Sequence, residues 1–181
     1  MSKLIFISSG HGGRDCGAVS KDGKLKEAEL ALRLRDAVAS NLKSKGCDVV
    51  TDGGTGENQS LPEALKKFHL KPVVAVEFHF NAGPVNKATG VEALSLPAYK
   101  PLAQALAQAT SNETGLFARG DRGWKPDTAG QHHRLAFCRA GGVILEICFI
   151  SNNQDLQTYL ANQFRVARAL AGVLERFAGM A

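Results

Sequence analysis

The sequence lacks several features that define particular classes of protein. Only four of its 181 residues are cysteines, and no two of them form a Cys-x-x-Cys pair. This usage argues against a disulfide scaffold and predicts reduced thiols in a protein made in the cytoplasm, at Cys16, Cys47, Cys138 and Cys148. The N-terminus lacks a charged-then-apolar leader, and no apolar run approaches the ~20 residues that span a bilayer. We therefore expect neither an export signal nor stable membrane insertion.

Runs of lysine and arginine interleaved with aromatic residues are absent as well, although the chain is basic. It has 22 Lys and Arg against 17 Asp and Glu, a net charge of +5 and a pI near 9.1. Such a balance suits an anionic partner: nucleic acid, a membrane surface or an acidic cell-wall polymer. Without the interleaved pattern, nucleic acid is the weaker of these interpretations, and we expect no nucleic-acid partner.

Low-complexity tracts, internal repeats and linkers are missing too, so 1–181 is predicted to be one domain. Short apolar runs alternate along the chain with segments whose apolar residues recur every three or four positions, the spacing of a helix. Strands are expected at 4–7, 47–51, 73–80, 90–96 and 143–150, and helices at 27–45, 61–70, 100–113, shortly after 153, and 163–177. The alternation predicts an α/β fold with a twisted, mostly parallel sheet flanked by helices on both faces. Ligands of such sheets bind beyond the carboxyl ends of the strands.

A histidine follows the first predicted strand in a glycine-rich turn. His11 stands between Gly10 and the pair Gly12-Gly13, and glycines adopt backbone angles that other residues avoid. A histidine held just past the end of a strand is well placed to face a shared cleft. The alternative is a histidine in an ordinary surface turn. The other candidate site residues along the chain favour the cleft.

Two carboxylates stand where apolar residues are expected. Glu27 lies one helical turn before Leu30, in line with an apolar stripe, so it should point at the core. The alternative is a helix-start glutamate favoured by the helix dipole. Glu146 stands in the middle of the apolar strand at 143–150, where burying a lone carboxylate is costly unless a charge or metal offsets it. We favour a catalytic acid there over a structural salt bridge.

The strand at 73–80 carries polar residues on one face. Alternation places Glu77, His79 and Asn81 on one side and apolar residues on the other. This composition is unusual for a core strand. It favours a functional site over a satisfied core histidine.

A long polar loop is predicted at 115–133, and loops of this length are often functional. Its basic side chains either hold acidic substrate groups or form a solvated rim: Arg119, Arg122 and Lys125, with Trp124 among them. Three further histidines are interpreted as surface or loop-packing residues: His69, His132 and His133.

Two histidines and one glutamate form a known zinc-binding set that leaves a fourth position for water. Here the set would be His11, Glu27 and His79, from two strand ends and one helix start. Bound Zn²⁺ polarises a carbonyl oxygen and lowers the pKa of a water molecule toward ~7. A nearby carboxylate can take that proton and pass it to a leaving amine, and Glu146 is the candidate. The predicted chemistry is hydrolysis of an amide.

Six segments, in order, carry a resemblance to a known family: 10–18, 27–30, 78–82, 90–92, 121–125 and 145–152. The chain resembles the zinc-dependent N-acetylmuramoyl-L-alanine amidases of the type-3 group, which cut between the lactyl group of muramic acid and the first alanine of peptidoglycan stems. The resemblance implies His11, Glu27 and His79 as zinc ligands and Glu146 as the catalytic carboxylate. It also implies a twisted, mostly parallel sheet flanked by helices.

The chain departs from the family pattern at two places. Thr51 is followed by Asp52 and a shortened loop, where the family often has Thr-Arg. Glu77 stands where the family often has serine. Because Glu77 shares a strand face with His79, it is either a partner that orients the imidazole or a rival ligand.

Without an export signal or a wall-binding repeat, the chain resembles a phage or prophage endolysin, made in the cytoplasm and reaching the wall after a holin opens the membrane. Its positive charge would help hold it on the anionic wall; lysis of purified sacculi should then weaken between low and physiological salt. Two alternatives stay open: another zinc peptidase that acts within the stem peptide, and a catalytically inactive wall-binding module.

Overall fold

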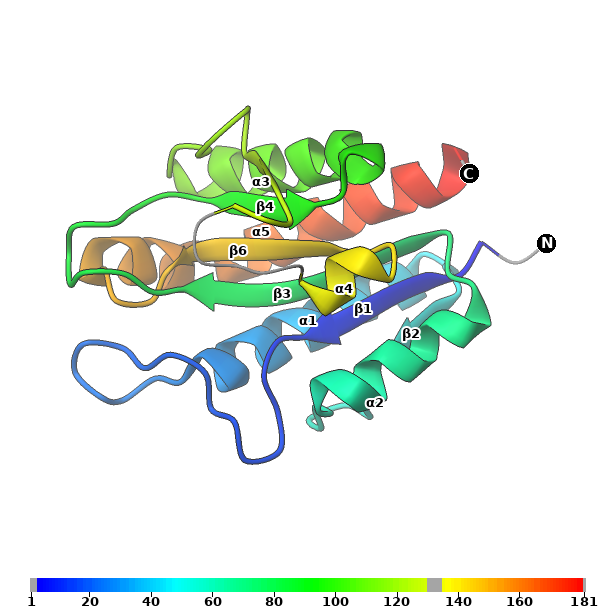
Figure 1. Cartoon of the computed structure of the whole chain (residues 1–181), viewed down its shortest axis with the longest axis horizontal. Coiled ribbons are helices and arrows are strands. Elements are labelled where there is room, and N and C mark those ends of the chain that lie inside the picture. Colours follow the sequence, from blue (N-terminus) through cyan, green and yellow to red (C-terminus); the bar gives the residue numbers. More distant parts are fainter. Residues whose placement is uncertain (1–2, 130–134, 181) are drawn as a thin grey trace.

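The computed structural model describes residues 3–129 and 135–180 (Figure 1). Within these ranges six strands form one sheet: β1 Ile5–Ser9, β2 Val49–Thr51, β3 Val74–Asn81, β4 Glu92–Ser95, β5 Trp124–Pro126 and β6 Val143–Phe149. The same ranges contain five α-helices: α1 Glu27–Ser44, α2 Leu61–Lys66, α3 Lys100–Thr114, α4 Ala136–Arg139 and α5 Asn153–Met180. Short 3-10 helices follow α2 and precede α3, at Lys67–Leu70 and Pro97–Tyr99.

The strands lie in the order β2-β1-β3-β6-β4-β5. The first four run parallel, β4 is antiparallel to β6, and β5 runs parallel to β4. The predicted single-domain α/β fold with a mostly parallel sheet is therefore confirmed. Since β1, β3 and β6 are parallel neighbours, their carboxyl ends share one edge of the sheet, where α/β folds bind their ligands.

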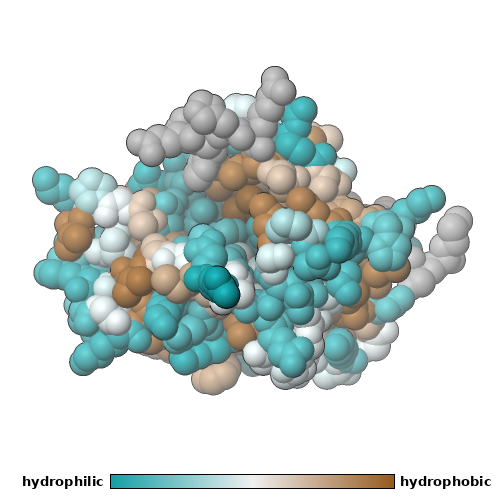
Figure 2. Space-filling view, turned by 60° about the horizontal axis from the view of Figure 1, so that its bottom comes forward, coloured by the Kyte–Doolittle hydropathy of each residue, from teal (hydrophilic) through white to brown (hydrophobic). Residues whose placement is uncertain are grey.

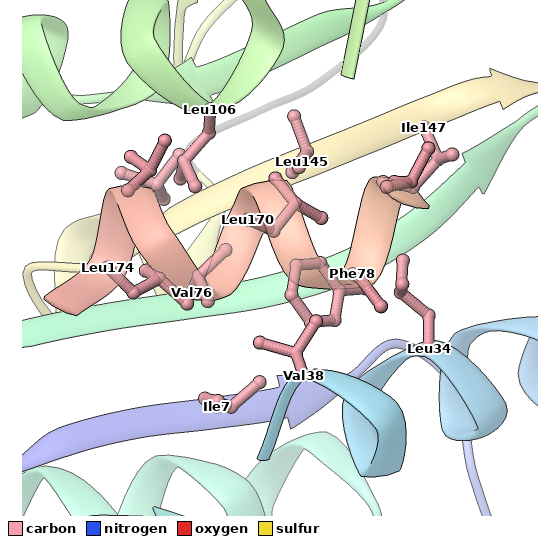
Figure 3. Close-up of a cluster of buried hydrophobic side chains, with 14 of the residues drawn as sticks. Ile7, Leu34, Val38, Val76, Phe78, Leu106, Leu145, Ile147, Leu170 and Leu174 are labelled. Carbon is pink, nitrogen blue, oxygen red and sulfur yellow. The ribbon is translucent and has the colours of Figure 1, made fainter. Parts of the chain in front are cut away.

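Helices cover both faces of this sheet. On one face α5 packs between α1 and α3 (Figure 1). The larger core lies beneath these three helices, and Figure 3 shows ten labelled side chains that meet there: Ile7, Leu34, Val38, Val76, Phe78, Leu106, Leu145, Ile147, Leu170 and Leu174. Full burial of one such side chain contributes about 1.5–3 kcal/mol. These contacts hold the central strands rigidly in place.

The opposite face is covered less completely. Residues of α2 and α4 form a smaller cluster with side chains of the strands: Phe6, Ala64, Ala75, Leu94, Phe137, Cys138 and Ile144. Because side chains alternate along a strand, Val76 and Phe78 of β3 enter the larger core while Glu77 and His79 face this second layer. The polar side of β3 therefore lies on the thinly covered face.

One segment predicted as a loop contains a strand. Residues Trp124–Pro126 form β5, which pairs with β4 at the edge of the sheet. Three residues are too few to show alternation, and Pro126 lacks the N–H that a central strand would need. The pairing is instead created by a neighbour about thirty residues away in the chain: Leu94 lies opposite Lys125.

The end of the chain is one helix where the sequence predicts two. Helix α5 runs unbroken from Asn153 to Met180. Its start is capped by Asn152, whose Oδ1 accepts hydrogen bonds from the N–H groups of Gln154 and Asp155. No proline or glycine occurs among the nineteen residues from Asn153 to Ala171. The division predicted before 163 therefore has no physical cause. The other expected bounds differ by a few residues.

The helices carry their apolar residues on the sides packed against the sheet. Among the described residues there is no helix both long and apolar enough to cross a membrane. The face drawn in Figure 2 is largely hydrophilic, with hydrophobic residues gathered mainly in one area.

Candidate metal centre

The ends of β1 and β3 bring two histidines together. The N–H of Gly10 donates to the carbonyl oxygen of Phe78 over 2.8 Å, which carries the strand pairing past the end of β1. His11 then takes a left-handed backbone conformation, with φ of 61°, and turns its ring back toward β3. The ring centroids of His11 and His79 lie 5.0 Å apart. The two side chains therefore lie side by side, and this geometry favours the cleft over the surface-turn interpretation of His11.

Glu27 joins the two rings. It is the first residue of α1, is 4% exposed, and points into the site as predicted. Its Oε2 lies 3.1 Å from Nε2 of His11, and its Oε1 lies 3.0 Å from Nδ1 of His79. The N–H groups of Ala18 and Phe80 donate to the same carboxylate and fix its orientation.

The geometry of these three residues fits a small divalent cation. One potential ligand atom from each of His11, Glu27 and His79 lies within 4.8 Å of the others. Two imidazoles and a carboxylate are donors that Zn²⁺ accepts, and three protein ligands leave one position open for a reacting group. The set could therefore hold a catalytic zinc ion.

The charges in the site favour positive charge next to Glu27. Burial by itself would raise the pKa of Glu27, but its hydrogen bonds with His11 and His79 outweigh burial and hold that pKa far below its usual range. The hydrogen bond with Glu27 raises the pKa of His11. The pKa of His79 is raised well above its ordinary value, because hydrogen bonds with Glu27 and Glu77 overcome the opposing effect of burial. Glu27 is thus an anion that attracts positive charge from both sides.

Glu146 lies next to this cluster, on β6. It pairs with His79 in the strand register, is 8% exposed, and has one carboxylate oxygen without a hydrogen-bond partner. Burial raises its pKa to about 7. In the described part of the chain no arginine or lysine forms an ion pair with Glu146, so the salt-bridge interpretation has no support there. An unpartnered buried carboxylate is costly and is found at functional sites more often than elsewhere.

Two cavities of about 250 Å³ each meet at the histidines. The first is mainly apolar apart from the site residues and contains Glu146; it is lined by His11, Glu27, His79, Phe80, Asn81, Ala82, Leu135, Ile144 and Glu146. The second lies on the other side of His79 and is lined by Ser9, His11, Gly12, Asp15, Gln59, Ser60, Leu61, Glu77 and His79. A bound group can therefore reach the three ligands and Glu146 from one cavity.

Sequence reasoning missed the role of Glu92 in this region. Glu92 lies opposite Glu146 in the β4–β6 register, and its Oε2 accepts from Arg119 and Lys125 over 2.6 Å each. These two basic side chains are therefore neutralised in part within the fold, while Arg122 is largely exposed. Alternation from the buried Leu94 could have placed Glu92 on the face of Glu146.

Of the three remaining histidines, the structure describes only His69, which lies outside the site. His69 is exposed, in agreement with its interpretation as a surface residue, and its ring contacts the carbonyl oxygen of Lys66. His132 and His133 lie outside the described residues, as does part of the predicted loop at 115–133.

If His11, Glu27 and His79 bind Zn²⁺, replacing Gly10 with alanine should weaken that binding about 10–100-fold. A β-carbon on Gly10 would lie 2.3–2.5 Å from three ring atoms of His79, so the imidazole must move out of its position. Competition with a chromophoric chelator measures the change. Gly172→Ala is the matched control, because a β-carbon there meets nothing within 4 Å. Equal zinc affinity in both variants would contradict the importance of this contact.

Comparison with known proteins agrees with the geometry. The family model for N-acetylmuramoyl-L-alanine amidase matches residues 5–176. A crystal structure of a candidate N-acetylmuramoyl-L-alanine amidase from Neisseria meningitidis is 41% identical, with a TM-score of 0.88 over 98% of this chain and 96% of that one. The catalytic domain of CwlV, an N-acetylmuramoyl-L-alanine amidase from Bacillus (Paenibacillus) polymyxa, is 27% identical, with a TM-score of 0.82 over 99% of each chain.

A curated relative gives a partial match. The germination-specific N-acetylmuramoyl-L-alanine amidase of Bacillus subtilis is 29% identical over 105 residues, which cover 50% of this chain and 44% of that protein. The family match, by contrast, spans nearly the whole chain and includes all four candidate site residues. The chain therefore belongs to the N-acetylmuramoyl-L-alanine amidase family.

Proposed function

We propose that residues 1–181 form a zinc-dependent amidase domain that hydrolyses the bond between N-acetylmuramic acid and L-alanine in peptidoglycan. His11, Glu27 and His79 would hold the metal, and Glu146 would be the catalytic carboxylate. One observation carries the proposal: three donor atoms within 4.8 Å of one another lie beside a buried carboxylate that has an unpartnered oxygen.

The residues around the site suit this reaction. Zinc, when bound, supplies polarisation of the scissile carbonyl and lowers the pKa of a water molecule. Burial raises the pKa of Glu146 to about 7 in the metal-free site. A carboxylate at this position can accept a proton from water and donate it to the leaving amine. Phe80, Leu135 and Ile144 line the same cavity and give it an apolar wall beside the reacting groups.

Removing the metal is expected to abolish hydrolysis of purified peptidoglycan, and adding Zn²⁺ should restore it. EDTA followed by dialysis gives the metal-free protein, and mass spectrometry of the soluble products gives the bond that is cut. An amidase releases intact stem peptides with a free alanine amine and leaves the glycan uncut. Full activity after complete metal removal would contradict zinc dependence.

The same products separate two alternatives. Another zinc peptidase would release fragments cut within the stem peptide, whereas a wall-binding module would bind sacculi and release nothing. The presence of His11, Glu27, His79 and Glu146 in one site favours an active hydrolase over a binding module.

We further propose that the protein serves as a phage or prophage endolysin, made in the cytoplasm and admitted to the wall by a holin. Its net charge of +5 supports retention on an anionic wall. Production in bacterial cytoplasm should then cause lysis only when a holin is produced as well. Turbidity of the culture reports the outcome, and rapid lysis without the holin would argue against this role.

A further inference from the structure

Each histidine of the candidate metal centre has a second carboxylate on its outer side. Nδ1 of His11 lies 2.8 Å from Oδ2 of Asp15, and Nε2 of His79 lies 3.1 Å from Oε1 of Glu77. The two carboxylates differ in exposure: the side chain of Asp15 is 67% exposed, and that of Glu77 is 6% exposed. The contact at His79 is therefore the one that water screens little.

Glu77 is held by both of its oxygens. It lies two residues before His79 on the same face of β3, so its Oε1 reaches the ring. Its Oε2 accepts a hydrogen bond of 2.9 Å from the hydroxyl of Ser8, which lies directly opposite in β1 and is fully buried. A carboxylate anchored in this way by a neighbouring strand keeps one orientation toward the imidazole.

The position of Glu77 decides between its two interpretations from the sequence. Glu27 faces Nδ1 of His79, while Glu77 faces Nε2, on the opposite side of the ring. A metal ion between His79 and Glu27 would have the imidazole between itself and Glu77. Glu77 therefore does not lie where a ligand of that ion would be, and the group of donor atoms that fits a metal contains His11, Glu27 and His79.

We propose that Glu77 is a positioning residue that accepts a hydrogen bond from the Nε2–H of His79. This bond selects the tautomer in which Nδ1 presents its lone pair to the metal, and it fixes the ring between Gly10 and Glu27. Outer carboxylates are known to act on metal-binding histidines in this way, by orienting the ring and raising its basicity. The inference rests on the proposed function, in which His79 binds zinc.

The test compares zinc affinity among single variants. The dissociation constant is measured by chelator competition, and the absorption spectrum of the Co²⁺-substituted protein reports ligand geometry independently of activity. Glu77→Ala should bind zinc about 10–100-fold more weakly and alter the cobalt spectrum. Glu77→Gln should lie between it and the parent, because its amide oxygen can still accept from Nε2–H but carries no charge.

Two further variants test the mechanism. Ser8→Ala removes the anchor of Glu77 and should weaken zinc binding by a smaller factor than Glu77→Ala. Asp15→Asn is the matched control on the exposed carboxylate, and its effect should be smaller than that of Glu77→Gln. A role in folding alone would lower the unfolding temperature of the metal-free protein without changing the cobalt spectrum of the folded fraction.

Glu77→Ala with the zinc affinity and cobalt spectrum of the parent would overturn the inference. Where that variant does not fold, Glu77→Gln decides in the same way. Equal losses of zinc affinity in Asp15→Asn and Glu77→Gln would also overturn the inference, because the buried carboxylate of Glu77 would then act no more strongly than the exposed one of Asp15. If the parent protein binds no zinc, both the proposed function and this inference fail. If the parent binds zinc and the Glu77 variants bind it equally well, only the inference fails.

Discussion

Glu146→Gln is expected to slow hydrolysis of peptidoglycan about 10²–10⁴-fold, the range of rate lost when a general acid–base group is removed. Glutamine has nearly the same size and fills the same position on β6, but it cannot take a proton from water or give one to an amine. The rate of release of alanine amines from purified sacculi measures the effect. Activity within a few-fold of the parent would remove Glu146 from its proposed role.

Measurements of zinc affinity and of stability show whether the Glu146→Gln variant is otherwise intact. Glu146 is not one of the three residues that converge on the metal position, so zinc affinity should stay near that of the parent. Burial raises the pKa of Glu146 from its ordinary 4.5 to about 7, so the folded protein binds more protons than the unfolded chain between these values. Its stability therefore falls as pH rises through this window. The metal-free variant should accordingly be more stable than the parent at pH 8, by up to about 3 kcal/mol.

Arg35→Met is expected to lower the free energy of unfolding by about 3–5 kcal/mol, because it leaves a buried charge without its partner. The guanidinium of Arg35 is fully buried in α1, and its Nη1 donates to Oδ1 of Asp52 over 2.8 Å. The same group donates to the carbonyl oxygens of Gly54 and Glu57, over 2.7 Å each. Methionine fills much of this space but replaces none of these bonds.

The loss should reach the metal centre as well. Asp52 accepts from the N–H and hydroxyl of Ser9 and from the N–H of Gln59, so it joins the end of β1 to the loop after β2. Asn58 of that loop donates to the carbonyl oxygen of His11 over 3.1 Å. Without Arg35 this loop loses its hydrogen bonds at Gly54 and Glu57, and any zinc affinity of the site should fall together with stability.

Urea unfolding of the metal-free protein measures the stability change. Arg33→Met is the matched control, because Arg33 is exposed on the same helix and its replacement should change stability by less than about 0.5 kcal/mol. A loss of under about 1 kcal/mol for Arg35→Met would show that the buried ion pair is not important for this fold.

Asp52 also explains a departure from the family pattern. The sequence shows an aspartate after Thr51 where arginine is common, and this change has no meaning until its partner is known. The structure places Asp52, which follows β2, against Arg35 of α1, seventeen residues earlier in the chain. Charge patterns report pairing within one helix or strand, but they cannot report a partner brought by the packing of a helix on a sheet.

The sequence by itself determined the class of fold, and it singled out the four residues now proposed for the site. Local periodicity predicted α1, β3 and β6 closely, because their apolar positions repeat at the spacing of the buried face. Glu27 and Glu146 were conspicuous for interrupting those patterns, and parallel strands necessarily end at the same edge of the sheet. The convergence of His11 and His79 therefore follows from the positions of their strands.

Only the tertiary structure decided the contacts made between distant segments. These include the edge pairing of β5, the antiparallel direction of β4, the partner of Asp52, and the ring nitrogen of His79 that each carboxylate faces. Each of these contacts depends on the order of the strands and the packing of the helices. The spacing of neighbouring residues encodes neither the strand order nor the helix packing. For the same reason the sequence left Glu77 with two possible roles, whereas its place on the outer side of the imidazole leaves one.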